Sequence, residues 1–210
     1  MQYIKGLDAF DGRNHTAVTL GKFDGLHRGH QKLLNRIMKY AQKEDCDSVV
    51  CAFDMDRDCL MTNEERRAFL EDKVDYLIEI PFTREMMEME AEKFIDEILH
   101  KKLHASHIVV GTDFNFGHEK RGNHQMLEKY AAKYGYTVDV VEKAYYKDRE
   151  ISSTYIREAL EKGEMELAKD LLGYPYFVSG EVLHGRHMGG RLLFPTTNLI
   201  PTTRKLLPPN

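Results

Sequence analysis

The chain has 210 residues and a net charge of −4 at neutral pH, and 42% of its residues are hydrophobic. This length suits one ordinary domain, or one domain and a fragment, with enough apolar material for a sizeable core. The acidic balance argues against a general nucleic-acid binder, and no apolar stretch approaches the roughly 18 residues of a membrane span. The three cysteines form no C-x-x-C pair, which predicts reduced thiols in a cytoplasmic protein.

The first predicted element is a buried strand at residues 16–20, where β-branched and apolar residues follow one another. The chain then passes through Gly21, Gly25 and Gly29 into a predicted helix. The helix is indicated by apolar residues that recur on one face, namely Leu33, Leu34, Ile37, Met38 and Ala41.

The loop between this strand and this helix contains His27-Arg28-Gly29-His30, an H-x-G-H pattern. Two histidines three residues apart in a first helical turn project the same way, toward the free backbone N–H groups and the positive end of the helix dipole. Glycine between them lets a polyphosphate approach the backbone. The pattern therefore predicts a site for charge that develops on a phosphate during transfer. The alternative, two solvent-facing histidines at a helix start, is disfavoured by the flanking G-x-F-D-G sequence at residues 21–25.

Strands and helices are predicted to alternate as far as residue 172. Thr62 and Glu65 have the spacing of a capping box that opens one of the helices. Such alternation favours a doubly wound parallel sheet, in which ligands bind beyond the carboxyl ends of the strands, where the strand order reverses. We expect further strands at residues 48–53, 75–80, 107–111 and 136–141, and further helices over residues 62–70, 94–103, 126–134, 151–160 and 165–172.

Residues 111–117 form a glycine-bounded loop at the carboxyl end of a predicted strand, at the same rim as His27. Phe114 and Phe116 offer aromatic faces that can contact a flat ring, and Asp113 offers a hydrogen-bond acceptor. The residues alone favour the simpler interpretation, a surface loop with two half-buried phenylalanines.

Residues 151–157 contain three hydroxyl side chains and an arginine at a predicted helix start. Ser152, Ser153 and Thr154 can cap backbone donors or bind phosphate oxygens, and Arg157 can reach the same oxygens. The residues alone favour simple helix capping with a solvated Arg157.

The sequence pattern changes from helix to strand and loop after Gly173, where a Gly-x-Pro sequence ends the helical pattern. We place a domain boundary there, between residues 1–173 and residues 174–210. A strand is expected over residues 176–183, and residues 194–198 read F-P-T-T-N, which by itself is a proline turn flanked by threonines.

These stretches together resemble a known family. The run G-x-F-D-G-x-H-x-G-H is similar to the signature of the bacterial bifunctional riboflavin kinase/FMN adenylyltransferases, also called FAD synthetases. The sequences at residues 111–117, 151–157 and 194–198 resemble later elements of that family, so that the resemblance covers essentially the whole chain. It implies a Rossmann-like α/β domain of the H-x-G-H nucleotidyltransferase type, followed by the start of a β-barrel riboflavin kinase-like module.

The resemblance implies transfer of AMP from ATP to FMN, giving FAD and pyrophosphate, with Mg²⁺ bridging the phosphates. FMN already supplies an anionic nucleophile, so the protein has to position the substrates and stabilise charge. By position, the resemblance implies catalytic roles for His27, His30, Ser153 and Arg157; ATP or phosphate binding by Gly21, Lys22, Phe23, Asp24, Gly25, Gly29, Ser152 and Thr154; flavin binding by Asp113, Phe114, Phe116 and Arg121; and metal binding in the kinase-like part by Thr196 and Asn198.

The kinase-like part ends at Asn210, before the acidic residue that the family uses as a base. A barrel short of most of its strands cannot close, so we expect no riboflavin phosphorylation from this chain alone. The expected partners are small molecules (ATP, FMN and, in a longer chain, riboflavin), without nucleic acid or membrane. Self-association through the unpaired strands of the incomplete module is a further expectation.

Two departures from the family pattern keep other functions open. Lys22 stands where the family has Asn, and Phe53-Asp54-Met55-Asp56 replaces a sequence of the type F-[DE]-P-H-P. One alternative is a flavin- or nucleotide-binding protein that has lost catalysis. The other is a related H-x-G-H nucleotidyltransferase with a different phosphate substrate, which the resemblance of residues 111–117 and of the kinase-like tail to the family disfavours.

Overall fold

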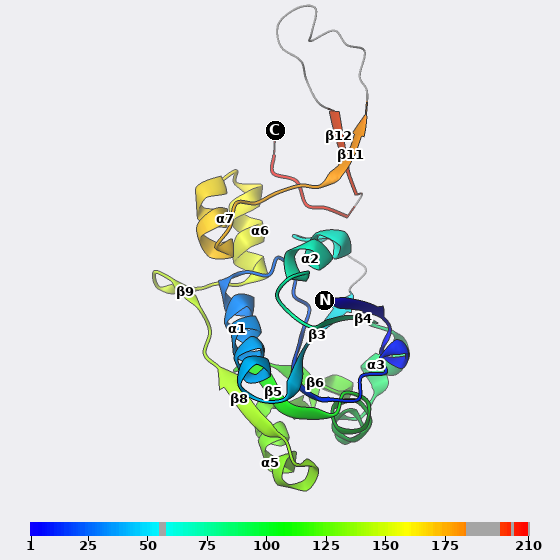
Figure 1. Ribbon diagram of the computed structural model, residues 1–210. Coiled ribbons are helices and arrows are strands. Elements are labelled where there is room, and N and C mark those ends of the chain that lie inside the picture. Colours follow the sequence, from blue (N-terminus) through cyan, green and yellow to red (C-terminus); the bar gives the residue numbers. More distant parts are fainter. Residues whose placement is uncertain (55–57, 184–197, 203, 210) are drawn as a thin grey trace, which may run out of the picture.

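The computed structural model describes residues 1–54, 58–183, 198–202 and 204–209, and a six-stranded parallel sheet lies at the centre of this part of the chain (Figure 1). The strand order is β1-β4-β3-β2-β5-β8, and all of its pairings are parallel, as the alternation of strands and helices predicted. The strands are β1 (Gln2–Lys5), β2 (His15–Gly21), β3 (Cys46–Asp54), β4 (Tyr76–Pro81), β5 (Ala105–Gly111) and β8 (Thr137–Val141).

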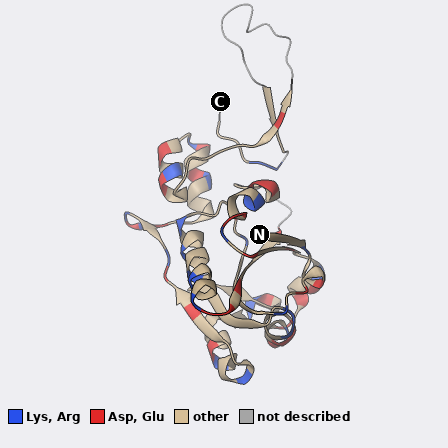
Figure 2. Ribbon diagram, viewed as in Figure 1, with Lys and Arg blue, Asp and Glu red and all other residues tan. Residues whose placement is uncertain are grey.

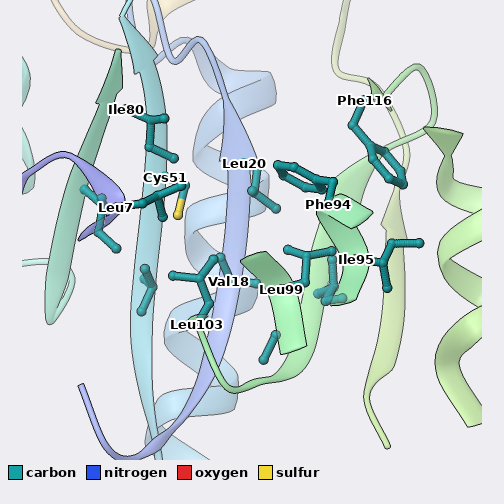
Figure 3. Close-up of a cluster of buried hydrophobic side chains, with 14 of the residues drawn as sticks. Leu7, Val18, Leu20, Cys51, Ile80, Phe94, Ile95, Leu99, Leu103 and Phe116 are labelled. Carbon is teal, nitrogen blue, oxygen red and sulfur yellow. The ribbon is translucent and has the colours of Figure 1, made fainter. Parts of the chain in front are cut away.

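Successive side chains of a strand point to opposite faces of the sheet. Both faces are apolar, and helices cover each of them. Val18 and Leu20 of β2 belong to a cluster with side chains of the helical segment η2 (Phe94–Lys102), which Figure 3 shows packed against this face. Ala17 belongs to a second cluster, with side chains of α1 (Arg28–Lys43) and α2 (Asn63–Leu70). The short α4 (Ala91–Lys93) and α5 (His124–Tyr134) complete the first of these layers.

The predicted helix over residues 94–103 has π-helical rather than α-helical bonding. The N–H group of Leu103 reaches the carbonyl of Ile98, five residues back, at 2.9 Å. With that wider turn, the side chains of Phe94 and Leu99 lie on the same buried face, five residues apart. Apolar spacing predicted the helix but not its type.

Two strand predictions need correction. β1 was not predicted, because four residues at the edge of a sheet that pair only with β4 carry too short a pattern. The strand expected over residues 176–183 is shorter, β11 (Gly180–Leu183), which pairs antiparallel with β12 (Asn198–Pro201). The N–H group of Ser179 donates to the Glu65 carboxylate at 2.9 Å, so a side chain and not a strand satisfies that backbone group.

Two further helices, α6 (Ser153–Glu161) and α7 (Met165–Leu172), pack together beside the sheet domain, and β11 and β12 project away from it (Figure 1). No helix in the described residues is both long and apolar enough to span a membrane. The remaining short elements are η1 (Leu7–Ala9), α3 (Arg84–Glu88), β6 (Asn115–Phe116), η3 (His118–Lys120), β7 (Gly122–Asn123), β9 (Tyr145–Tyr146) and β10 (Arg149–Glu150).

Candidate active site

The strand order reverses between β2 and β5. From β2 the chain continues to β3 and β4 on one side of the sheet, and then crosses to β5 and β8 on the other. The loops that leave the carboxyl ends of β2 and β5 therefore meet at the switch point, where doubly wound sheets bind ligands. The first loop leads to His27, and the second contains Asp113. The largest effect on the pKa of His27 is burial, which lowers it, and the nearby charges of Asp24 and Asp113 act in the opposite direction.

The loop before His27 has an unusual backbone. Phe23 and Leu26 have φ angles of 46° and 36°, and Gly25 has a φ of 85°. Residues other than glycine rarely adopt such angles, and each one held in this conformation costs roughly 1–3 kcal/mol of conformational free energy. Phe23 and Leu26 are fully buried, so packing holds them in place. A Cβ atom on Gly25 would lie 3.2 Å from the Cβ atom of Leu60, which leaves this position to glycine.

The two histidines of the H-x-G-H pattern stack on one another at the start of α1, with ring centroids 3.7 Å apart. His27 is the N-cap residue, and its side chain is buried. Burial lowers the pKa of His27 to about 4, and burial, followed by unfavourable electrostatic interactions with His27 and Arg66, holds the pKa of His30 well below 6.5. Both rings are therefore neutral at pH 7. The Nδ1 atoms of both are buried without a hydrogen-bond partner in the described residues.

Asp24 joins three segments of the site. Its carboxylate accepts two hydrogen bonds, one from the backbone N–H group of Leu60 at 2.7 Å and one from the guanidinium of Arg157 at 2.5 Å. The hydroxyl of Ser153 donates to the carbonyl of Asp24 at 2.9 Å. The carboxylate is 9% exposed and bound on both oxygens by protein groups. Its contacts are those of a residue that holds the site together, and the phosphate binding that the resemblance implies for Asp24 stays a prediction.

The start of α6 combines capping with hydrogen bonds to the rest of the site. The Ser152 side chain accepts the N–H group of Tyr155 at 3.2 Å, so Ser152 is the N-cap, as the alternative interpretation of this stretch had it. Thr154 is exposed. Arg157 donates through Nη2 to the carbonyl of Asp58 at 2.9 Å as well as to Asp24, so both of these contacts use one of its three nitrogens.

A cavity of about 210 Å³ opens at the carboxyl ends of β2 and β3. It is lined by side chains of both charges from the β2 loop, the end of β3, α2 and the C-terminal segment, and Figure 2 shows basic and acidic residues together on α2. The lining includes Lys22, Asp54, Asp58, Asn63, Arg66 and Arg204.

Arg66 and Arg204 were not among the predicted site residues. The Arg66 side chain is 5% exposed and lies 3.4 Å from Glu79, yet its Nε atom has no hydrogen-bond partner in the part of the chain that the structure describes. An arginine in a helix with two neighbouring charges normally signals a solvated face, so the sequence carried no indication of this burial. Arg204 comes from the C-terminal segment and lies 3.8 Å from Asp54.

The predicted flavin-binding residues differ in their surroundings. Phe116 is 7% exposed and packs on Phe94, with centroids 5.3 Å apart, so its ring belongs to the core. Phe114 is half-buried and lies at the rim, 5.6 Å from Phe116 between centroids. Asp113 is exposed and pairs with Lys143 at 3.1 Å, and Arg121 pairs with Glu119. Asp113 and Phe114 follow β5, whose carboxyl end lies at the switch point, and flavin binding by the four residues stays a prediction.

Some predicted positions lie outside the described residues. These are Met55 and Asp56, where the sequence departs from the family pattern, and Thr196. Asn198 begins β12 and is exposed. A metal-binding role for Thr196 and Asn198 stays a prediction.

Comparison with known proteins gives results that agree with the resemblance. A family model described as FAD synthetase matches residues 10–155, and one described as riboflavin kinase matches residues 172–210. The bifunctional riboflavin kinase/FMN adenylyltransferase of Buchnera aphidicola subsp. Schizaphis graminum is 34% identical over 223 residues, which cover 100% of this chain and 71% of the relative. The protein of the same name from Haemophilus influenzae is 35% identical over 211 residues, covering 95% of this chain and 68% of the relative.

The same name belongs to an Escherichia coli protein of which the match covers 64%, so the chain spans about two thirds of the length of these relatives. A solved structure is also similar, with a TM-score of 0.85 and 29% identity over 99% of this chain and 71% of that one. Its title describes a macrolide-efflux protein from Streptococcus pneumoniae.

Proposed function

The chain belongs to the FAD synthetase family, and from this membership we propose that it transfers the adenylyl group of ATP to FMN. A phosphate oxygen of FMN attacks the α-phosphorus of ATP, and the bond from that phosphorus to the bridging oxygen of the β-phosphate breaks. The products are FAD and pyrophosphate, and no proton has to be removed from the nucleophile. The observation that carries the proposal is the pair of neutral, stacked histidines at the start of α1, beside the switch point of the sheet.

The histidines act as hydrogen-bond donors to phosphate oxygens. Each neutral imidazole carries one N–H group, and the backbone N–H groups of the first turn of α1 point the same way. His27 is buried, His30 is half-buried and both rings are already neutral, so their N–H groups require little reorganisation as charge moves onto pyrophosphate. A phosphate oxygen would also give a partner to a buried ring nitrogen that has none among the described residues.

In this proposal the start of α6 binds the remaining phosphates. Ser152, Ser153 and Thr154 surround its N-terminus, and the anchored guanidinium of Arg157 has donors besides Nη2 for a phosphate. On the other side of the switch point, Phe114 offers a half-buried ring face to the flavin. In this proposal residues 1–173 carry adenylyl transfer, and residues 174–210 belong to the kinase-like part.

Magnesium fits the pocket as an ion bound mainly by substrate. Mg²⁺ is commonly held by one or two carboxylates together with phosphate oxygens and water. Asp54 and Asp58 line the cavity, and no cluster of three or more metal-binding side chains occurs in the described residues. Bound Mg²⁺ would offset negative charge on the phosphates. Removal of the ion with EDTA should abolish FAD formation, and added Mg²⁺ should restore it.

The test is chromatographic detection of FAD after incubation with ATP, Mg²⁺ and FMN. His30→Ala should lower turnover by about 10²–10³-fold, the usual effect of losing one fixed donor to a developing charge. His15→Ala is the matched control, because His15 is an exposed histidine at the amino end of β2. Unchanged turnover in His30→Ala would remove the phosphate role. Flavin binding without FAD formation by the unaltered chain would overturn the proposed reaction in favour of a binding protein.

A further inference from the structure

The C-terminal segment, residues 202 and 204–206, lies against the loop at residues 58–61. The N–H group of Cys59 donates to the carbonyl of Arg204 at 2.8 Å, and the N–H group of Leu206 donates to the carbonyl of Cys59 at 2.9 Å. These two bonds form an isolated parallel bridge between Cys59 and Lys205. Residues separated by more than 140 positions are thus paired through their backbones.

Lys205 anchors this segment through a buried charge. Its Nζ atom donates to the carbonyl of Leu60 and to the Glu65 carboxylate, each at 2.7 Å, and lies 4.4 Å from the centroid of the Tyr176 ring. The side chains of Lys205 and Glu65 are each 1% exposed. The other carboxylate oxygen of Glu65 accepts the N–H and hydroxyl groups of Ser179, both at 2.9 Å. Charges are rarely buried to this degree unless they are paired and hydrogen-bonded, as these are.

Leu60 connects Lys205 to the loop between β2 and α1, which contains Asp24 and leads to His27. Leu60 accepts from Lys205 through its carbonyl and donates to the carboxylate of Asp24 through its N–H group. Asp24 in turn binds Arg157 and lies three residues before His27. Glu65 also leads directly into Arg66 of α2, so both partners of Lys205 belong to segments that line the cavity or hold its residues.

The segment also contributes directly to the cavity. Thr202 and Arg204 are among the residues that line it, and the Arg204 guanidinium lies 3.8 Å from the carboxylate of Asp54, another lining residue. Arg66 lines the cavity as well, and its buried Nε has no hydrogen-bond partner among the residues that the structure describes, as expected where an anionic ligand supplies the missing partner.

We propose that the C-terminal segment is a wall of the adenylyl-transfer site, with Lys205 as a positioning residue and Arg204 as a contact for the phosphates of ATP. This inference rests on the proposed function. Lys205 has no route to the substrate, since its ammonium group is enclosed by Leu60, Glu65 and Tyr176. It acts by fixing the loop that holds Asp24. The segment lies within the part matched by the riboflavin kinase model, so the kinase-like part supports the chemistry of the first domain.

Lys205→Met tests the anchor, because methionine keeps the unbranched stem and removes the charge. We expect kcat/KM for FAD formation to fall at least tenfold. Lys169→Met, at an exposed lysine of α7 whose ammonium pairs with Glu166, is the matched control and should change nothing. The double variant Lys205→Met/Glu65→Gln removes the unpaired buried carboxylate, and should recover part of the lost thermal stability without recovering kcat/KM, because the bond to Leu60 is still missing.

A kcat/KM of Lys205→Met equal to that of the unaltered chain would overturn the proposal. Full recovery of kcat/KM in the double variant would also overturn it, because a residue that only stabilises the fold predicts that activity recovers together with stability. If Lys205→Met does not fold, Arg204→Met decides, because it leaves the anchor intact. We expect a several-fold higher KM for ATP with an unchanged unfolding midpoint, and an unchanged KM would overturn the wall.

Failure of the proposed reaction would be recognised separately. If the unaltered chain forms no FAD, the reaction is wrong, and the wall is then tested by calorimetric titration with Mg·ATP. At least tenfold weaker ATP binding in Lys205→Met than in Lys169→Met would support the wall, and equal binding would overturn it.

Discussion

The buried histidine at position 27 makes the stability of the protein depend on pH in a way that can be calculated. Burial lowers its pKa from 6.5 in the unfolded chain to about 4 in the folded one. Between pH 6.5 and pH 4, His27 is therefore mostly protonated in the unfolded state and mostly neutral in the folded state. The stabilisation is fully present above pH 6.5 and is lost as the pH falls toward 4.

The magnitude follows from these two pKa values. Between pH 7 and pH 5 the unfolded histidine becomes almost fully protonated, whereas the folded one stays neutral, which removes about 2 kcal/mol from the free energy of unfolding. His30, whose pKa burial also lowers, changes stability in the same direction. The loss in the unaltered protein should therefore exceed the loss in His27→Gln by about 2 kcal/mol.

Urea unfolding at pH 7 and pH 5 measures this difference. The chain contains no tryptophan, so circular dichroism is the better probe. Carboxylates also titrate in this range, but their contribution is common to both proteins and cancels when the two losses are subtracted. His15→Gln, at an exposed histidine, should behave like the unaltered chain. An equal loss in His27→Gln and in the unaltered chain would refute the argument that His27 is held neutral by burial.

Three further changes test the packing and the site. Ile37→Ala, in a fully buried position of α1, should lower the free energy of unfolding by about 2–5 kcal/mol, measured by urea unfolding, and a loss below 1 kcal/mol would contradict its burial. Gly25→Ala should lower the melting temperature and slow FAD formation together, because φ is 85° and the new Cβ would press on Leu60; a variant with normal melting would show that the loop is not so constrained. Asp24→Asn should destabilise by about 2–3 kcal/mol in urea, since Arg157 loses its charged partner, and unaltered stability would contradict the role of Asp24 in holding the site together.

The parts of the fold that the sequence predicted are those with local patterns. The strand before the H-x-G-H loop, the helix after it and the capping box of Thr62 and Glu65 each depend on spacings within a few residues, and the structure contains all three. β1 was missed because its partner β4 is more than 70 residues away and the strand itself is short. Local spacing also gives no information on π-helical bonding, which depends on how η2 packs on the sheet.

The candidate site shows the same limit at the level of single residues. Glu65 was predicted only as the reciprocal partner of a cap, and it is that, but it also binds Lys205 from 140 positions away. Arg66 and Arg204 carry no sequence pattern that distinguishes them from solvated arginines, and only the tertiary structure brings them to one cavity. Asp24 lies inside a recognised motif, yet its contacts with Leu60 and Arg157 could not be read from the motif.

The strained loop before His27 needs support from outside its own sequence. Two non-glycine residues with positive φ cost roughly 1–3 kcal/mol each and persist only where their surroundings determine the conformation. Packing of Phe23 and Leu26 supplies part of that support, and the charged hydrogen bonds to Asp24, worth roughly 1.5–3 kcal/mol each, supply another part of similar size. One of those bonds comes from Leu60, whose carbonyl is held by Lys205. The conformation of the loop that leads to His27 therefore depends on contacts with a segment near the other end of the chain, which is why we expect the loss of Lys205 to lower the rate of the proposed adenylyl transfer.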